Sequence, residues 1–67
     1  MINVRLDHVL LDKRMKLKDL AEKTGIAVNN LSVLKTNKAR AIRFSTLNAL
    51  CEALDCTPGD LLDYVPG

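Results

Sequence analysis

Residues 17–34 read LKDLAEKTGIAVNNLSVL, and this stretch decides the fold that the sequence predicts. Two short helices packed across a tight turn would share an apolar seam made of Leu20, Ile26, Leu31 and Leu34. Ala21 leaves room for a close crossing, and Gly25 can adopt the left-handed conformation that ends the first helix. The geometry leaves one face of the second helix free, and such a face fits the major groove of DNA.

The length and composition limit the class of protein. A chain of 67 residues is near the lower limit for folding alone, so we expect one domain over residues 1–67, too small for a large substrate pocket. With one Tyr, one Phe and no Trp, the core must be aliphatic. No apolar run is long enough to span a membrane, and MINVRLD lacks the core of a signal peptide. We therefore expect a cytoplasmic protein.

Helical spacing predicts three helices in the first part of the chain. Their expected ranges are about 6–14, 17–24 and 28–35, so that a pair of helices joined by a turn spans about 17–35. Neither Lys16 nor Ala27 offers a side-chain oxygen as a cap, which costs about 1 kcal/mol at each helix. Packing is therefore expected to hold the pair together. Asn37 is the candidate left-handed residue that closes the third helix.

A loop and a fourth helix are expected next. Residues 36–44 show no apolar period, and Phe44 is expected to anchor this loop to the core. Ser45 is expected to cap the fourth helix. The clearest amphipathic stripe in the chain then follows, formed by Leu47, Leu50, Cys51 and Leu54.

The tail is predicted to form a short fifth helix and a strand. An N-cap, a first-turn proline and a capping acid are supplied by Thr57, Pro58 and Asp60. The helix is expected to carry Leu61 and Leu62. A strand at residues 2–4 is expected to pair with residues 62–65, within one chain or between two chains.

The net charge of +2 conceals a polarised distribution. Residues 23–43 contain five bases and no acid, whereas residues 44–67 contain four acids and no base, which gives charges of +5 and −4. A domain of this kind can present a basic face to a polyanion. The alternative is that uneven charge is ordinary in so small a protein.

The third helix is the candidate for reading bases. If Leu31 and Leu34 point inward, the residues turned outward are Val28, Asn29, Ser32 and Val33, with Asn30 at the edge. An asparagine amide can pair with adenine through two hydrogen bonds, and valine can contact thymine methyl groups. These residues are weak helix formers, whereas a surface selected for stability would use Glu, Lys or Ala. Which of the two asparagines reads a base is left open. The alternative is that the third helix is an ordinary surface helix that reads no bases.

Contacts to the DNA backbone are expected from the segment that ends and follows this helix. The candidates are Lys35, Asn37, Lys38, Arg40 and Arg43. Phosphate neutralisation requires positive charge beside the groove, where this segment would lie. The alternative is a solvated run of charge.

Catalytic and metal-binding chemistry finds no support in the sequence. His8 is the only histidine, and Cys51 and Cys56 are the only cysteines, so a four-ligand zinc set cannot be assembled. We expect His8 at the surface, Cys51 in the core and no disulfide in a reducing compartment. Neither a catalytic triad nor a glycine-rich phosphate loop is present. No cofactor and no small-molecule substrate are expected.

The chain resembles the Cro/C1-type helix-turn-helix family of bacterial and phage transcription regulators, in its compact single-domain branch. The matching stretches are LAEKTGI (20–26), LSVLK (31–35) and LNALCEALDCTPGDLLDY (47–64). The resemblance implies an all-α, five-helix domain that binds double-stranded DNA through its third helix. It also implies a dimer on a near-palindromic operator, and we expect the fifth helix or the terminal segments to carry the dimer contact.

The chain departs from the family pattern at four positions. Leu17 stands where a phosphate-contacting Gln is frequent, and Ala27 where a capping Ser or Thr is usual. Lys35 replaces an acid and Asn37 replaces a glycine found in many members. The sequence therefore predicts a DNA-binding regulator, a repressor or autoregulator, without the phosphate contact of the second helix. The alternative is an antitoxin-like or adaptor module that uses the same fold to bind protein.

Overall fold

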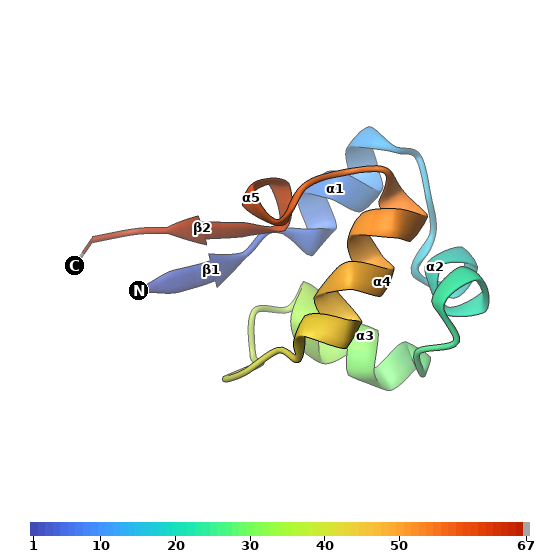
Figure 1. The fold of residues 1–67 in the computed structure, drawn as a ribbon, viewed down its shortest axis with the longest axis horizontal. Helices are drawn as coiled ribbons and strands as arrows, with labels where there is room; N and C mark the ends of the chain where they lie inside the picture. Colours follow the sequence, from blue (N-terminus) through green and yellow to red (C-terminus); the bar gives the residue numbers. More distant parts are fainter. Residues whose placement is uncertain (67) are drawn as a thin grey trace.

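The computed structural model describes residues 1–66 and shows five helices and a two-stranded ribbon (Figure 1). In chain order the elements are β1 (Ile2–Val4), α1 (Leu6–Asp12), α2 (Leu17–Thr24), α3 (Val28–Lys35), α4 (Phe44–Leu54), α5 (Pro58–Leu61) and β2 (Leu62–Tyr64). The five-helix architecture and the ranges of α2 and α3 are as predicted. The helices form a body about α4, and the ribbon projects from it with both termini at its tip.

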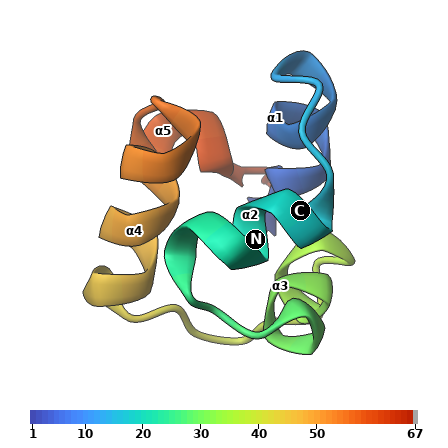
Figure 2. The same ribbon diagram turned by 90° about the vertical axis from the view of Figure 1, so that its right-hand side faces the viewer.

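The core is aliphatic, as the composition predicts. Its buried side chains are Leu6, Val9, Leu10, Leu20, Leu31, Leu34, Leu47, Leu50, Leu54 and Leu61. All five helices contribute to it, and none of the ten is aromatic. In Figure 2, α2 lies in front of the other helices, and it packs against both α3 and α4. Burial of these leucines therefore holds the helix pair, whose N-caps Lys16 and Ala27 make no side-chain cap hydrogen bond to their helices.

The first helix ends two residues earlier than predicted. Arg14 is left-handed, with φ of 52°, and its N–H donates to the Leu11 carbonyl at 3.1 Å. The Met15 N–H donates to the Leu10 carbonyl at 2.9 Å, which completes a helix-terminating motif that usually contains glycine. Met15 packs against the core, so burial of its side chain favours this stop.

The start of α4 corrects two predictions. Arg43, not Ser45, is the N-cap, and its carbonyl accepts the Leu47 N–H at 2.9 Å. Phe44 is 89% exposed and does not anchor the loop to the core. It is the first residue of α4 and precedes Leu47, the first buried residue of that helix. Ala39 and Ile42 hold the loop instead, since both pack against the core.

The fifth helix is shorter than predicted and leads directly into the strand. Leu62 is extended, with φ of −123° and ψ of 137°, and belongs to β2 rather than to α5. The strands pair within the chain, antiparallel, with Ile2 opposite Tyr64 and Val4 opposite Leu62. The predicted pairing is therefore confirmed. The Arg5 N–H donates to the Leu61 carbonyl at 2.7 Å and ties the ribbon to the helical body.

The start of α5 is capped as predicted. The Asp60 carboxylate accepts the Thr57 backbone N–H at 2.9 Å and its hydroxyl at 3.1 Å. These two hydrogen bonds lower the pKa of Asp60 below its ordinary value of 3.8. The negative charge also lies in the first turn of the helix, where it is favourable.

This shift predicts how the effect of Asp60→Asn depends on pH. A carboxyl with a depressed folded pKa adds stability above its unfolded pKa and loses it as pH falls through the folded pKa. Asp60→Asn is therefore expected to lower the urea midpoint at neutral pH, and the difference from wild type is expected to shrink below 3.8. Urea unfolding followed by circular dichroism at a series of pH values measures this. A difference that stays constant into strong acid would contradict the assignment.

Candidate nucleic-acid interface

The outer face of α3 is the candidate reading surface. Leu31 and Leu34 are buried at 0% and 6% exposure and fix the orientation of the helix on the core. The predicted reading residues Val28, Asn29, Asn30 and Val33 are exposed, whereas Ser32 is half-buried. The structure thus places four of the five candidates in solvent. Val28 and Val33, at 48% and 44% exposure, are apolar side chains that the core does not use.

The turn before α3 is held by Thr24, a residue that the sequence analysis did not single out. Gly25 is left-handed as predicted, with φ of 74°. The Thr24 hydroxyl donates to the Leu20 carbonyl at 2.8 Å and accepts the Ile26 N–H at 3.2 Å. Because these hydrogen bonds span the glycine, they fix the direction in which the chain leaves α2. The start of α3 is therefore positioned without a cap of its own.

The end of α3 is tied to the ribbon through Asn37. This residue is left-handed, with φ of 61°, as predicted. Its side-chain oxygen accepts the Val4 N–H at 2.8 Å, and its side-chain nitrogen donates to Asn3 Oδ1 at 3.1 Å. The amide of Asn37 therefore has a structural role in the described chain, and contact of this residue with DNA stays a prediction.

Thr36 is a surface residue that the sequence analysis missed. It is exposed and follows Asn29 and Val33 at intervals of seven and three residues, which places it on the same helical face. Its hydroxyl donates to the Ser32 carbonyl at 2.9 Å. The helical spacing would have identified it if the predicted helix had been extended by one residue.

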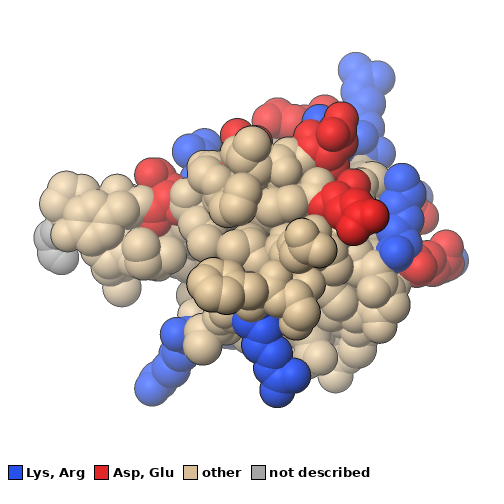
Figure 3. Space-filling view, in the orientation of Figure 1, with Lys and Arg blue, Asp and Glu red and all other residues tan. Residues whose placement is uncertain are grey.

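A group of basic side chains adjoins this face. Lys35, Lys38, Arg40 and Arg43 are all exposed. Within residues 1–66 none of them takes part in an ion pair, since the single salt bridge there joins Arg5 to Asp63 at 4.0 Å. Figure 3 shows basic side chains and no acidic ones at the lower edge, near α3 and its following loop, whereas acidic and basic side chains are interspersed along the upper and right-hand edges. The lower edge in this view is therefore basic, as the charge of residues 23–43 predicts.

The cysteines and the histidine lie elsewhere. Cys51 packs against the core as predicted, and the Cys56 N–H donates to its carbonyl at 3.0 Å. Both thiols are free, and burial raises the pKa of Cys56, with the neighbouring Cys51 adding to the effect. His8 is exposed. Among residues 1–66 no three His, Cys, Asp or Glu side chains gather as metal ligands would.

Comparisons with known proteins identify the family. The model of the Cro/C1-type helix-turn-helix DNA-binding domain matches residues 5–67. The chain belongs to this family. It is also similar to an uncharacterized helix-turn-helix-type transcriptional regulator, YozG of Bacillus subtilis (strain 168), with 49% identity over 63 residues. That match covers 94% of the chain and 75% of YozG.

A solved structure supports the same assignment. The fold is similar to the crystal structure of a candidate DNA-binding protein from Bacteroides fragilis, with a TM-score of 0.83 and 28% identity. The match covers 94% of this chain and all of the other. The protein is therefore a helix-turn-helix DNA-binding regulator, and its family is one of transcription regulators rather than of enzymes. In residues 1–66, none of the helices has the length and apolar character of a membrane span.

Proposed function

We propose that the protein is a repressor that inserts α3 in the major groove of its operator and acts by occupying that site. The observation that carries this proposal is an exposed helix face beside four cations that have no acidic partner among residues 1–66. Phosphate contacts position a protein on DNA, and base contacts supply specificity. Both kinds of group are available on the same side of the molecule. Its place of action is the cytoplasm.

Base reading is assigned to the predicted residues of α3. Asn29 is exposed on the outer face of α3, so its amide is assigned the two hydrogen bonds with adenine N6 and N7. Val28 and Val33 are assigned contacts with thymine methyl groups. Asn30 lies at the edge of this face, and Ser32 is half-buried, which favours contact through its hydroxyl at the rim.

Backbone contacts are assigned to the end of α3 and the loop after it. Lys35 and Lys38 flank the end of the helix, and Arg40 and Arg43 follow in the loop. Each would neutralise a phosphate and release a counterion. The side chain of Asn37 already makes hydrogen bonds to β1. We therefore assign this residue a contact with the DNA backbone only through atoms that these bonds do not use.

Arg43→Ala is expected to weaken binding to all DNA sequences by a similar factor. The variant loses one phosphate contact, so the slope of log affinity against log salt is expected to fall by about 1. The Arg43 carbonyl still caps α4, since that bond is made by the backbone. Fluorescence anisotropy with cognate and random duplexes at several salt concentrations measures the slope. Lys13→Ala removes the same charge at the C-cap of α1 and serves as the control. An unchanged slope for Arg43→Ala would reject the contact.

Selection of bound sequences from a random DNA pool tests the function as a whole. We expect a near-palindromic site with half-sites about 34 Å apart, as for two copies of one helix in successive major grooves. Enrichment of no sequence, together with binding that disappears at moderate salt, would contradict sequence-specific reading. The alternative function, an antitoxin-like or adaptor module, predicts no gel shift of genomic fragments at either low or moderate salt. An acid-free basic segment is not required by a protein partner, which favours DNA.

A further inference from the structure

The C-terminal end of α4 brings the two cysteines of the chain together. Asp55 ends the helix in a left-handed conformation, with φ of 50°. Its N–H and that of Cys56 both donate to the Cys51 carbonyl, the latter at 3.0 Å. Helix ends of this kind bond the residue after the left-handed one to a carbonyl five positions earlier, and the side chains of these two residues are frequently in contact. Cys51 and Cys56 occupy the two positions.

The backbone geometry permits a disulfide between these cysteines. With standard bond lengths, the hydrogen bond of 3.0 Å holds their Cα atoms at most about 7 Å apart. This separation falls within the limit beyond which a disulfide would need the backbone to move. Both side chains pack against the core, and both thiols are free, so the pair is in its reduced form.

Small solutes can approach Cys56 through a cavity. This residue is half-buried and lines a cavity of about 400 Å³ whose other walls come from α1 and from the start of α5. The cavity is large enough for several water molecules. Hydrogen peroxide is only slightly larger than water, so an oxidant of this size has access to the Cys56 side of the pair.

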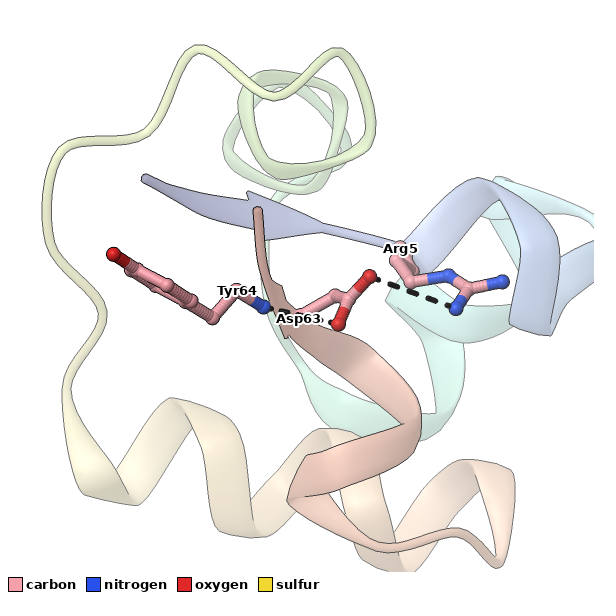
Figure 4. Close-up of polar contacts among 3 residues, drawn as sticks. All are labelled: Arg5, Asp63 and Tyr64. Atoms are coloured by element: carbon pink, nitrogen blue, oxygen red, sulfur yellow. Dashed lines mark hydrogen bonds and ion pairs between the residues drawn. The ribbon is translucent and has the colours of Figure 1, made fainter. Parts of the chain in front are cut away.

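Burial and a nearby cation act on the Cys56 thiol in opposite directions. Burial has the largest effect and raises the pKa of the thiol, and the neighbouring Cys51 adds to this shift. Lys13, which lines the same cavity, favours the thiolate. Arg5 also lines the cavity, but its guanidinium pairs with Asp63 at 4.0 Å (Figure 4). Cys56 is therefore mostly a thiol at neutral pH, and we expect it to react with oxidants more slowly than an exposed cysteine does.

We propose that Cys51 and Cys56 form a peroxide-reactive dithiol that closes a reversible disulfide between the last turn of α4 and the segment before α5. The Cys56 thiolate attacks one oxygen of hydrogen peroxide, the O–O bond breaks, and a sulfenic acid forms. The hydroxide that leaves takes up the proton that Cys56 has lost. The Cys51 thiol then attacks the sulfur of the sulfenic acid, so that the S–S bond forms, the S–O bond breaks, and the hydroxyl leaves with the thiol proton as water. One peroxide thus accepts two electrons from the pair, and two water molecules are formed.

The second thiol protects the fold from irreversible oxidation. A sulfenic acid with no thiol beside it is open to further oxidation, and the sulfinic and sulfonic acids that result are irreversible in most proteins. Because Cys51 and Cys56 both pack against the core, the charge of such an acid would lie at the edge of the core, where it is costly. The disulfide adds no charge and is reduced by exchange with another dithiol. In a reducing compartment it is therefore transient.

The pair lies away from the basic end of α4. Arg43 is the N-cap of this helix, and Cys51 follows eight residues later, about 12 Å along the helix axis. The disulfide is therefore expected to leave α3 and the basic side chains beside it unchanged. Its effect falls on the C-terminal part of the fold, where a covalent link restricts the unfolded chain. We expect the oxidised protein to be the more stable form.

Peroxide titration followed by mass spectrometry tests the proposal. The reduced protein is treated with hydrogen peroxide, and the remaining thiols are blocked with N-ethylmaleimide. We expect wild type to lose two hydrogen atoms and take up no maleimide, and to take up two maleimides after treatment with dithiothreitol. Residues 44–67 contain no Lys or Arg, so trypsin leaves both cysteines in one peptide, in which the linkage is assigned. A wild type that gains oxygen atoms instead, or that forms disulfides between two chains, overturns the proposal.

Cys51→Ala supplies the matched comparison. This variant keeps the thiol that lines the cavity and removes its neighbour, so a sulfenic acid at Cys56 is no longer trapped as an intrachain disulfide. The fraction of Cys56 that dithiothreitol does not recover is expected to rise about fivefold or more over wild type. An equal fraction in the two proteins shows that Cys51 does not trap the sulfenic acid, and this result overturns the proposal.

Two further measurements on wild type do not depend on the folding of a variant. Phenylarsine oxide bridges two thiols only where they lie side by side, so the folded protein is expected to gain one arsenical and to lose both maleimide sites. The urea midpoint of the disulfide form, followed by circular dichroism, is expected to exceed that of the reduced form. Retention of both maleimide sites, or a lower urea midpoint after oxidation, shows that the native fold does not hold the two sulfurs within bonding range and overturns the proposal.

Discussion

Leu31→Ala is expected to lower the free energy of unfolding by about 2–5 kcal/mol, a large part of the stability of so small a domain. Leu31 is 0% exposed and is the residue through which the reading helix is seated on the core. A chain of 67 residues has a total stability of roughly 3–10 kcal/mol, at the usual stability per residue. Because α3 has no side-chain cap hydrogen bond, packing holds the helix, and Leu31 is the more deeply buried of its two core residues. Urea titration followed by far-UV circular dichroism measures the loss.

The chain contains a matched control for this prediction. Leu11→Ala makes the same change at a side chain that is 77% exposed, so its effect is expected to stay within about 0.5 kcal/mol. Equal effects of the two substitutions would show that Leu31 does not face the core and that the register of α3 is wrong. All assignments to the outer face of α3 would then fail together.

The helix pair could be predicted closely because local and long-range signals agree there. The apolar seam sets the orientation of α2 and α3, and Gly25 marks the turn between them. At the end of α3, Asn37 is one of the few non-glycine residues that adopt a left-handed conformation readily. The turn between the two helices and the end of the second therefore have signals that can be read from single residues.

The misplaced boundaries have a common physical cause. Arg14 adopts a left-handed conformation that its side chain does not favour, and packing of the segment that follows sets this position. The start of α4 is similar, because Arg43 serves as a cap without a side-chain hydrogen bond. The hydrophobicity of Phe44 does not by itself say how far the core extends. Such features depend on the assembled tertiary structure.

The candidate site could be predicted only in part, because some of its features follow from helical geometry and others depend on the tertiary structure. The outward direction of Asn29 and Val33 follows from helical geometry once Leu31 is placed inside. The amide bonds of Asn37 to β1 depend instead on the ribbon, which joins segments more than 30 residues apart. Only the three-dimensional structure shows that this side chain is already engaged.

Asn29→Ala is expected to cost about 1–3 kcal/mol of binding free energy on the cognate site and little on random DNA. An asparagine that pairs with adenine supplies two hydrogen bonds whose geometry other bases cannot satisfy. On random DNA the affinity comes mainly from phosphate contacts, which this substitution leaves in place. Affinities for the selected site and for a shuffled duplex, measured at one salt concentration, give the specificity ratio. We expect this ratio to fall by roughly 5-fold to 150-fold.

Asn48→Ala provides the comparison, because Asn48 is exposed on α4 and lies outside the proposed reading face. Replacing asparagine by alanine raises helix propensity at both positions, so neither variant is expected to lose stability. If Asn29→Ala lowers affinity for cognate and random DNA by the same factor, Asn29 contacts the backbone instead of a base. Selection repeated with Asn30→Ala would then show whether the neighbouring asparagine reads the adenine. If neither variant changes the selected sequence, the outer face of α3 does not carry the specificity.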